Sequence, residues 1–195
     1  MGHSRDEKRA SHERIVEIAS RRLREAGTDG PGVADIMRAA GLTHGGFYKH
    51  FGSRDELVAE AVAHAFAESG AAIDEVVADA DDPLARFVDW YASARHCANP
   101  GDGCAIVALG ADAARAGDEV RRAYTAQVEA YLGRLADLIG AADEAEGRRE
   151  AAVALSALVG AVLVARAVDD PALADELLAD VRSFVRSRGR RDERA

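Results

Sequence analysis

The sequence is poor in the residues that cross-link or interrupt a chain. It contains 2 cysteines and 4 prolines in 195 residues, and aromatic residues make up only 5% of it. Two cysteines are too few for a disulfide-based scaffold. Because regularly spaced turn signals between alternating apolar runs are also missing, an all-β fold is disfavoured. With 48% hydrophobic and 30% charged residues, the composition is that of a globular protein, and we expect it to be all-α.

Long apolar runs are missing as well. The most apolar stretch, residues 151–165, is 15 residues long and contains Ser156, whereas a membrane span needs about 20 residues. The N-terminus shows no apolar stretch behind a basic region, so a secretory signal is not expected. We therefore expect a cytoplasmic protein with no membrane partner.

The net charge of −9 is unevenly distributed along the chain. Residues 1–57 hold 10 Lys and Arg against 9 Asp and Glu, whereas the remaining 138 residues hold 15 against 25. Because phosphate binding depends on local positive charge, the acidic total does not exclude a nucleic-acid partner. The asymmetry suggests two functional parts, although an ordinary acidic protein is the alternative.

Apolar periodicity and capping signals predict about nine helices and no strand. The first three helices are expected at about residues 6–27, 33–40 and 43–51, the third with the Thr43 hydroxyl as its cap. Ser53 and Glu56 form a capping box for a long fourth helix. Asp82-Pro83 and Asp170-Pro171 each open a later helix. Further helices are expected at 103–116, 118–140 and 148–168, and the charged end, 186–195, is expected to be frayed.

The second and third helices form a helix-turn-helix pattern at about residues 32–51. Gly41 ends the second helix, and Gly45 and Gly46 lie inside the third. Each interior glycine weakens a helix by about 1 kcal/mol relative to alanine. The missing side chains would let the helix approach a DNA backbone closely. The alternatives are that these glycines delay the helix start or pack against a neighbouring helix.

Polar and cationic side chains gather around these glycines, and such groups bind phosphate oxygens and base edges. Phe47 and Phe51, spaced by four, are expected to face inward. The candidate DNA-binding residues are Thr43, His44, Gly45, Gly46, Tyr48, Lys49, His50 and Arg54.

In the order and spacing of its residues, the segment at about 9–69 resembles the DNA-binding domain of the tetracycline-repressor (TetR-type) family. The resemblance rests on Arg14-Ile15-Val16, Ala19, Gly27, Val33, Asp35-Ile36, Ala39 to Thr43, Gly46 to Phe51 and Ser53 to Leu57. It implies a three-helix DNA-binding domain at 9–69, a ligand-sensing and dimerisation domain at 70–195, and a homodimer. The eight candidate DNA-binding residues match the DNA-contacting positions of that family.

Two positions depart from the family pattern. Gly32 stands where the family usually has Thr or Ser, and Gly46 where it often has a hydroxyl residue. Both differences put individual phosphate contacts in doubt. Residues 103–112 show a weaker resemblance to a C-terminal domain type of the same family.

The second domain shows no phosphate-binding loop, zinc-protease motif or nucleophile with an obvious base. We therefore expect no enzyme activity and no cofactor. Its larger apolar and aromatic residues either line a pocket for a small apolar effector or simply fill the core. They are Phe87, Trp90, Tyr91, Ile106, Leu109, Tyr124, Val128 and Tyr131.

Cys97 and Cys104 bracket residues 98–103, which are expected to form a loop. They are either unreactive thiols, a redox switch, or, with His96 and Asp102, part of a metal site. Two irregularly spaced cysteines are a weak signal for a metal, so no metal is expected.

The helix at 148–168 is apolar nearly all round and carries several small residues. It is therefore expected to be buried on every side. Together with the helix at 171–188 it would form a four-helix dimer interface, unless it is buried within one subunit.

Taken together, the sequence predicts a homodimeric transcriptional regulator, most simply a repressor that a small-molecule effector releases from DNA. Its partner would be a pseudo-palindromic operator in double-stranded DNA, read by one recognition helix in each half-site. The alternatives are a thiol-redox regulator acting through Cys97 and Cys104, and a helical interaction module that does not bind DNA.

Overall fold

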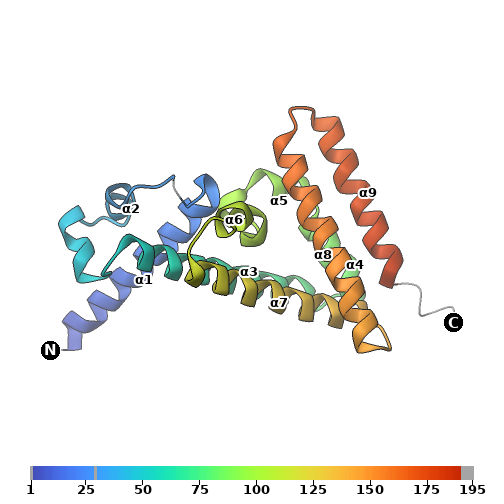
Figure 1. The fold of residues 1–195 in the computed structure, drawn as a ribbon, viewed down its shortest axis with the longest axis horizontal. Coiled ribbons are helices and arrows are strands. Elements are labelled where there is room, and N and C mark those ends of the chain that lie inside the picture. Colours follow the sequence, from blue (N-terminus) through green and yellow to red (C-terminus); the bar gives the residue numbers. More distant parts are fainter. Residues whose placement is uncertain (1, 29, 190–195) are drawn as a thin grey trace.

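The computed structural model describes residues 2–28 and 30–189, and the regular structure of these residues is helical throughout (Figure 1). The all-α prediction is confirmed. The elements in chain order are α1 (Gly2–Ala26), α2 (Val33–Ala39), the 3₁₀ helix η1 (His44–Lys49), α3 (Arg54–Val77), α4 (Pro83–Tyr91), α5 (Ala94–Ala98), the 3₁₀ helix η2 (Pro100–Asp102), α6 (Ala105–Ala113), α7 (Asp118–Ile139), α8 (Glu144–Ala167) and α9 (Pro171–Gly189).

The N-terminal end of the molecule is formed by α1, α2, η1 and the first turns of α3 (Figure 1). Helix α1 begins at Gly2, earlier than the predicted start near Asp6, and it ends where Gly27 adopts a left-handed conformation with φ of 76°. Ile15, Ala19 and Leu23 are buried, which confirms the apolar stripe predicted for this helix. This stripe packs against α3.

Helix α3 extends from this end into the rest of the molecule, where it packs against α7 (Figure 1). Its buried residues recur at helical spacing from Leu57 to Ile73, without a break at residue 69. The proposed domain boundary between residues 69 and 70 therefore lies inside one continuous helix. Because the buried residues of both ends form a single cluster, from Ile15 to Val185, the two predicted domains share one core.

Helices α8 and α9 pack side by side at the opposite end of the molecule from η1 (Figure 1). The alternative that α8 is buried within one subunit is wrong for the described chain, because Leu163 is 54% exposed and Val153 is 52% exposed. Helix α8 is long and apolar enough to cross a membrane by length and composition, but one such helix is weak evidence for a span. Its exposed apolar face needs a different explanation.

The caps predicted at three of the helix starts are confirmed. Ser53 Oγ accepts the N–H of Glu56 (3.1 Å), and the Glu56 carboxylate accepts the N–H of Gly52, one residue earlier than in a standard capping box. Asp82 accepts the N–H of Ala85 (2.9 Å) at the start of α4, and Asp170 accepts two backbone N–H groups at the start of α9.

Four local predictions need correction. Thr43 occupies the cap position of η1, but its hydroxyl makes no capping hydrogen bond. The expected loop at 98–103 begins in the last residue of α5 and contains η2. The predicted helix 103–116 is shorter, as α6 (Ala105–Ala113). Of the end expected to be frayed, residues 186–189 continue α9, and the rest lie outside the described residues.

Tyr48 and Phe51, three residues apart in the sequence, differ strongly in how much of the side chain is exposed. Phe51 is 2% exposed, whereas Tyr48 is 74% exposed. We expect Phe51→Ala to lower the free energy of unfolding by about 3–5 kcal/mol, because it leaves a cavity in the core. Tyr48→Ala, which removes a comparable ring from the surface, should cost less than about 0.5 kcal/mol. Urea unfolding of both variants measures the difference, and equal costs would contradict this packing.

Candidate nucleic-acid interface

The turn between α2 and η1 is set by one glycine. Gly41 has φ of 73°, a conformation that favours glycine because it has no Cβ. The N–H of Leu42 returns to the carbonyl of Met37 (2.9 Å), which closes the end of α2. Leu42 then packs against the core as predicted. The chain therefore leaves α2 in a fixed direction and enters η1 two residues later, at His44.

Two buried aromatic rings hold η1 against the core. Phe47 and Phe51 are each 2% exposed and stack with ring centroids 5.5 Å apart. The imidazole of His12, on α1, stacks on Phe51 with centroids 4.6 Å apart. These contacts confirm that the two phenylalanines face inward, and they determine which face of η1 points to solvent.

The opposite face of η1 is polar and open to solvent. Tyr48 is 74% exposed, more than any other large hydrophobic residue in the described part of the chain. The side chains of His44 and Lys49 are exposed, and they form no hydrogen bond or ion pair within the described part of the chain. Seven of the eight predicted DNA-binding residues thus lie together on η1 and its flanks: Thr43, His44, Gly45, Gly46, Tyr48, Lys49 and His50.

The two glycines of η1 are not required by the packing of the chain itself. A Cβ placed on Gly45 would meet no atom within 4 Å, and one on Gly46 would lie in ordinary contact with Met37 and Thr43, at 3.6 and 3.8 Å. Neither glycine has a positive φ. The alternative that Gly45 packs against a neighbouring helix is therefore wrong.

His50 lies at the edge of this face, between η1 and α1. Its Nδ1 is buried and has no hydrogen-bond partner. Burial, followed by the nearby positive charges of His12, Lys8 and Lys49, lowers the pKa of His50 below its ordinary value of 6.5. His12 in turn contacts the Glu60 carboxylate of α3 through Nε2 at 2.7 Å. Sequence reasoning did not identify this His12–Glu60 pair.

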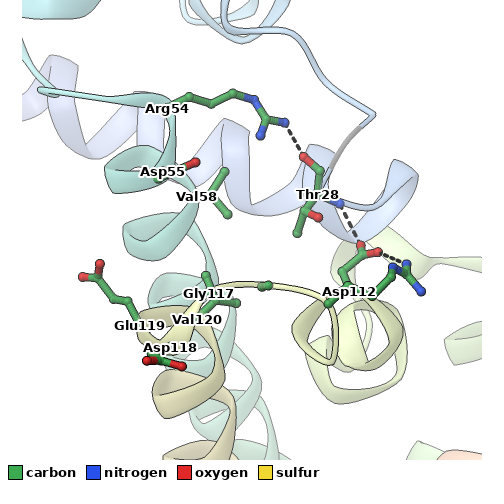
Figure 2. A pocket seen from close by; sticks show the side chains of 11 residues that line it. Thr28, Arg54, Asp55, Val58, Asp112, Gly117, Asp118, Glu119 and Val120 are labelled. Carbon is green, nitrogen blue, oxygen red and sulfur yellow. Dashed lines mark hydrogen bonds and ion pairs between the residues drawn. The ribbon is translucent and has the colours of Figure 1, made fainter.

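Arg54, the eighth predicted residue, has a different position. Figure 2 shows its side chain reaching from the start of α3 towards Thr28, and its guanidinium donates to the Thr28 carbonyl. It is half-buried at the junction between the two domains rather than exposed beside η1. Its role in DNA contact stays a prediction.

The eight residues predicted to line an effector pocket are all buried or half-buried in the second domain. Phe87, Tyr91 and Trp90 form an aromatic cluster, and Trp90 stacks on His96 with centroids 5.5 Å apart. The Tyr91 hydroxyl is fully buried and has no hydrogen-bond partner. The structure brings these residues into one core, while the four cavities described in the chain have other linings.

Both cysteines are free thiols. Cys104 is buried and its sulfur approaches the Tyr131 hydroxyl at 3.8 Å. Cys97 approaches the carbonyl of Val162 at 3.9 Å, and burial raises the pKa of its thiol. Within the described residues, no group of three His, Cys, Asp or Glu side chains could hold a metal ion.

His96, a possible metal ligand by its sequence position, instead contacts backbone groups through both ring nitrogens. Its Nδ1 faces the carbonyl of Tyr91 at 2.5 Å, and its Nε2 accepts the N–H of Cys104 at 2.8 Å. Because the first partner requires a donor and the second an acceptor, the ring is held neutral with its proton on Nδ1. Burial correspondingly lowers the pKa of His96.

A fixed short helix with a solvent-facing polar side, preceded by a second helix and a glycine turn, defines a helix-turn-helix protein. Residues 15–61 match the family model described as bacterial regulatory proteins, tetR family. The match confirms the resemblance to the tetR family over these residues, and it supports a DNA-binding regulator.

Solved structures of regulators have the same overall fold. A TetR-family regulator from Cytophaga hutchinsonii aligns with a TM-score of 0.78 and 17% identity, covering 93% of this chain and 96% of that one. One from Chloroflexus aurantiacus gives 0.78 and 20%, with the same coverage. The reduced form of Escherichia coli NemR gives 0.75 and 17%, over 91% and 96% of the two chains. No curated protein sequence matches the chain.

The lowered pKa of His50 predicts a pH-dependent stability. Because the folded state binds the His50 proton less readily than the unfolded state, this residue stabilises the fold above pH 6.5 relative to acid. That advantage is lost as the pH falls from 6.5 through the lowered pKa. We expect His50→Gln to remove part of the acid destabilisation. Urea unfolding of both proteins at pH 7.5 and pH 5 tests this, and parallel losses in the two proteins would contradict it.

Proposed function

We propose that the protein is a homodimeric transcriptional repressor that binds a pseudo-palindromic DNA operator and is released from it by a small-molecule effector. The observation that carries the DNA-binding part is the exposed face of η1. There a phenol, an imidazole and an ammonium group are exposed, and their polar atoms form no hydrogen bond or ion pair within the described residues. Hydroxyl, imidazole and cationic groups are suited to phosphate oxygens and base edges.

The glycines of η1 support the same proposal. A surface glycine in a helix destabilises it by about 1 kcal/mol relative to alanine, and here no internal contact requires the missing side chain at Gly45. Its absence is explained if another backbone must approach η1 closely. A DNA phosphate backbone beside a major groove is such a partner.

Substituting Gly45 should change the stability of the protein and its affinity for DNA in opposite directions. Gly45→Ala should leave stability unchanged or raise it by up to about 1 kcal/mol. The same substitution should weaken binding to the promoter DNA of the protein's own gene, because the added methyl group prevents close approach. Thermal unfolding and gel-shift titration measure the two effects.

Gly133 provides a matched control for this experiment. It is also exposed in a helix, α7, and a Cβ there would meet nothing within 4 Å. Gly133→Ala should gain similar stability and leave DNA affinity unchanged. Wild-type binding should also weaken steeply with salt, as expected for phosphate contacts. A wild-type protein that binds no promoter DNA would support the helical interaction module instead.

The dimer part of the proposal is supported by the exposed apolar face of α8 and α9. Val153, Leu163, Val164, Leu173 and Phe184 are each between 40% and 54% exposed in the single chain. Gly160, on α8, has open space around its missing side chain. Exposed apolar side chains gathered on two adjacent helices favour an interaction surface there. Small residues on it would allow a second copy of α8 to approach closely.

Leu163→Glu tests the dimer. Its side chain is 54% exposed in one chain, so the substitution should alter the fold of a single chain little. In a dimer through α8 and α9 it buries an unpaired charge, which should shift the protein to monomers. Sedimentation velocity measures the mass, and Thr125→Glu on α7 serves as the control. A Leu163→Glu protein that keeps the wild-type mass would contradict this interface.

The effector would be a small apolar molecule bound among the aromatic residues of the second domain, where the buried Tyr91 hydroxyl lacks a partner. It would act by favouring a dimer whose recognition helices no longer match the spacing of the half-sites. The redox alternative has less support, because the raised pKa of Cys97 disfavours the reactive thiolate. Operator binding would place the protein in the cytoplasm.

A further inference from the structure

Two residues outside the helix-turn-helix, one before it and one after it, contact each other. Thr28 precedes α2, and Arg54 is the first residue of α3, which follows η1. The Arg54 guanidinium donates to the carbonyl of Thr28. The segment that contains α2 and η1 is therefore closed into a loop by a hydrogen bond between its flanks.

One carboxylate of the second domain, that of Asp112, binds Thr28 and so attaches this loop to α6. The N–H of Thr28 donates to Asp112 Oδ2 at 2.8 Å, from the last turn of α6 (Figure 2). Asp112 also accepts from Arg115 at 2.8 Å. It is the one charged residue of α6, whose other residues are apolar or small. The backbone of Thr28 thus links Asp112, which binds its N–H, to Arg54, which binds its carbonyl.

The end of α1 is shaped to bring Thr28 to this carboxylate. Gly27 takes its left-handed conformation directly before Thr28, and a Cβ there would lie 2.9 Å from Asp112 Oδ2. Asp112 and the backbone of residues 27 and 28 are therefore in close contact. Any displacement of the last turn of α6 must move this backbone or break the hydrogen bond.

Packing contributes little on the neighbouring side of the junction. A cavity of about 330 Å³ separates the start of α7 from the first turns of α3, and it is lined by residues that include Asp55, Val58, Gly117 and Val120 (Figure 2). Thr28, Arg54 and Asp112 line the same cavity, so their hydrogen bonds connect the two parts along its wall.

We propose that Asp112 is a positioning residue, through which α6 fixes both ends of the helix-turn-helix relative to the second domain. The proposal rests on the proposed function in one respect, that the helix-turn-helix binds DNA. It adds the residue that anchors the Thr28 flank, to which Arg54 is bonded. Without the Thr28–Asp112 hydrogen bond, DNA binding must restore the order of this flank, which lowers the affinity.

Hydrogen exchange of the full chain tests the positioning role. In Asp112→Ala, exchange of the Thr28 amide should become roughly tenfold to a hundredfold faster, the factor expected for losing a hydrogen bond to a charged group. Amides of α2 and η1 should also exchange faster. Asp112→Asn keeps an acceptor oxygen for the Thr28 N–H and should retain most of the protection. Affinity for promoter DNA should fall severalfold in the alanine variant and be largely restored by asparagine.

Arg115→Ala is the matched control. Arg115 is 70% exposed and contacts Asp112 without reaching Thr28, so its loss should leave both exchange and affinity near wild type. Wild-type exchange at Thr28 in the Asp112→Ala protein would overturn the proposal, as would equal DNA affinity of the Asp112→Ala and Arg115→Ala proteins.

Two further outcomes keep the conclusions separate. If Asp112→Ala does not fold, the wild-type Thr28 amide decides instead, because rapid exchange there would show that the hydrogen bond is not maintained. If the wild-type protein binds no promoter DNA, the proposed function fails. The exchange data on Asp112→Ala and Asp112→Asn then still decide whether Asp112 positions the helix-turn-helix.

Discussion

The continuous burial of α3 is the constraint on which the other parts of this molecule depend. One stripe of apolar residues runs from Leu57 to Ile73 and packs against α1 in the first part and α7 in the second. A helix bends little without proline or an inserted group. Because α3 belongs to both domains, it determines how the N-terminal domain is oriented relative to the second domain. A hinge between residues 69 and 70 would break a buried helix, so motion between the domains must instead be a shift of packed elements.

Polar contacts at the junction between the two domains resist such a shift of packed elements in two places. On one side Asp112 holds Thr28. On another, the buried Arg24 guanidinium donates to Glu68 at 2.7 Å and reaches the carbonyl of Gly103 at 3.4 Å. A buried charge is strongly destabilising when it loses its partners, so this second contact keeps the loop before α6 against α1. Both ends of α6 are therefore attached to the N-terminal domain, the first end through Gly103 and the last through Asp112.

Sequence patterns predicted much of this arrangement because local rules govern it. The stripe of α1, the turn at Gly41, the cap at Ser53 and the inward phenylalanines follow from spacing and residue type, and the exposed cluster on η1 followed from the same segment. The long-range contacts could not be predicted in this way. Nothing in the local sequence pairs Asp112 with Thr28, 84 residues away, or His12 with Glu60, 48 residues away. The one local signal for Asp112 is that it is a lone charge on an apolar helix. The two alternatives for α8 stayed open in the sequence for a related reason, since an all-apolar helix indicates burial without saying whether the chain itself or a second copy covers it.

Two surfaces of the chain are left unexplained by its own packing, and they lie at opposite ends of the molecule (Figure 1). At one end Tyr48 exposes an aromatic ring beside two glycines, and at the other α8 and α9 expose aliphatic side chains. If the second surface pairs two chains, the distance between the two η1 helices depends on every element between the ends. A small rotation at α8 is then carried along α7 and α3 to the far end, where a longer lever produces a larger displacement. The proposed operator would detect that displacement because its half-sites have a fixed spacing. The shared core makes this lever stiff, and the two attachments of α6 are where a change in the second domain can act on it.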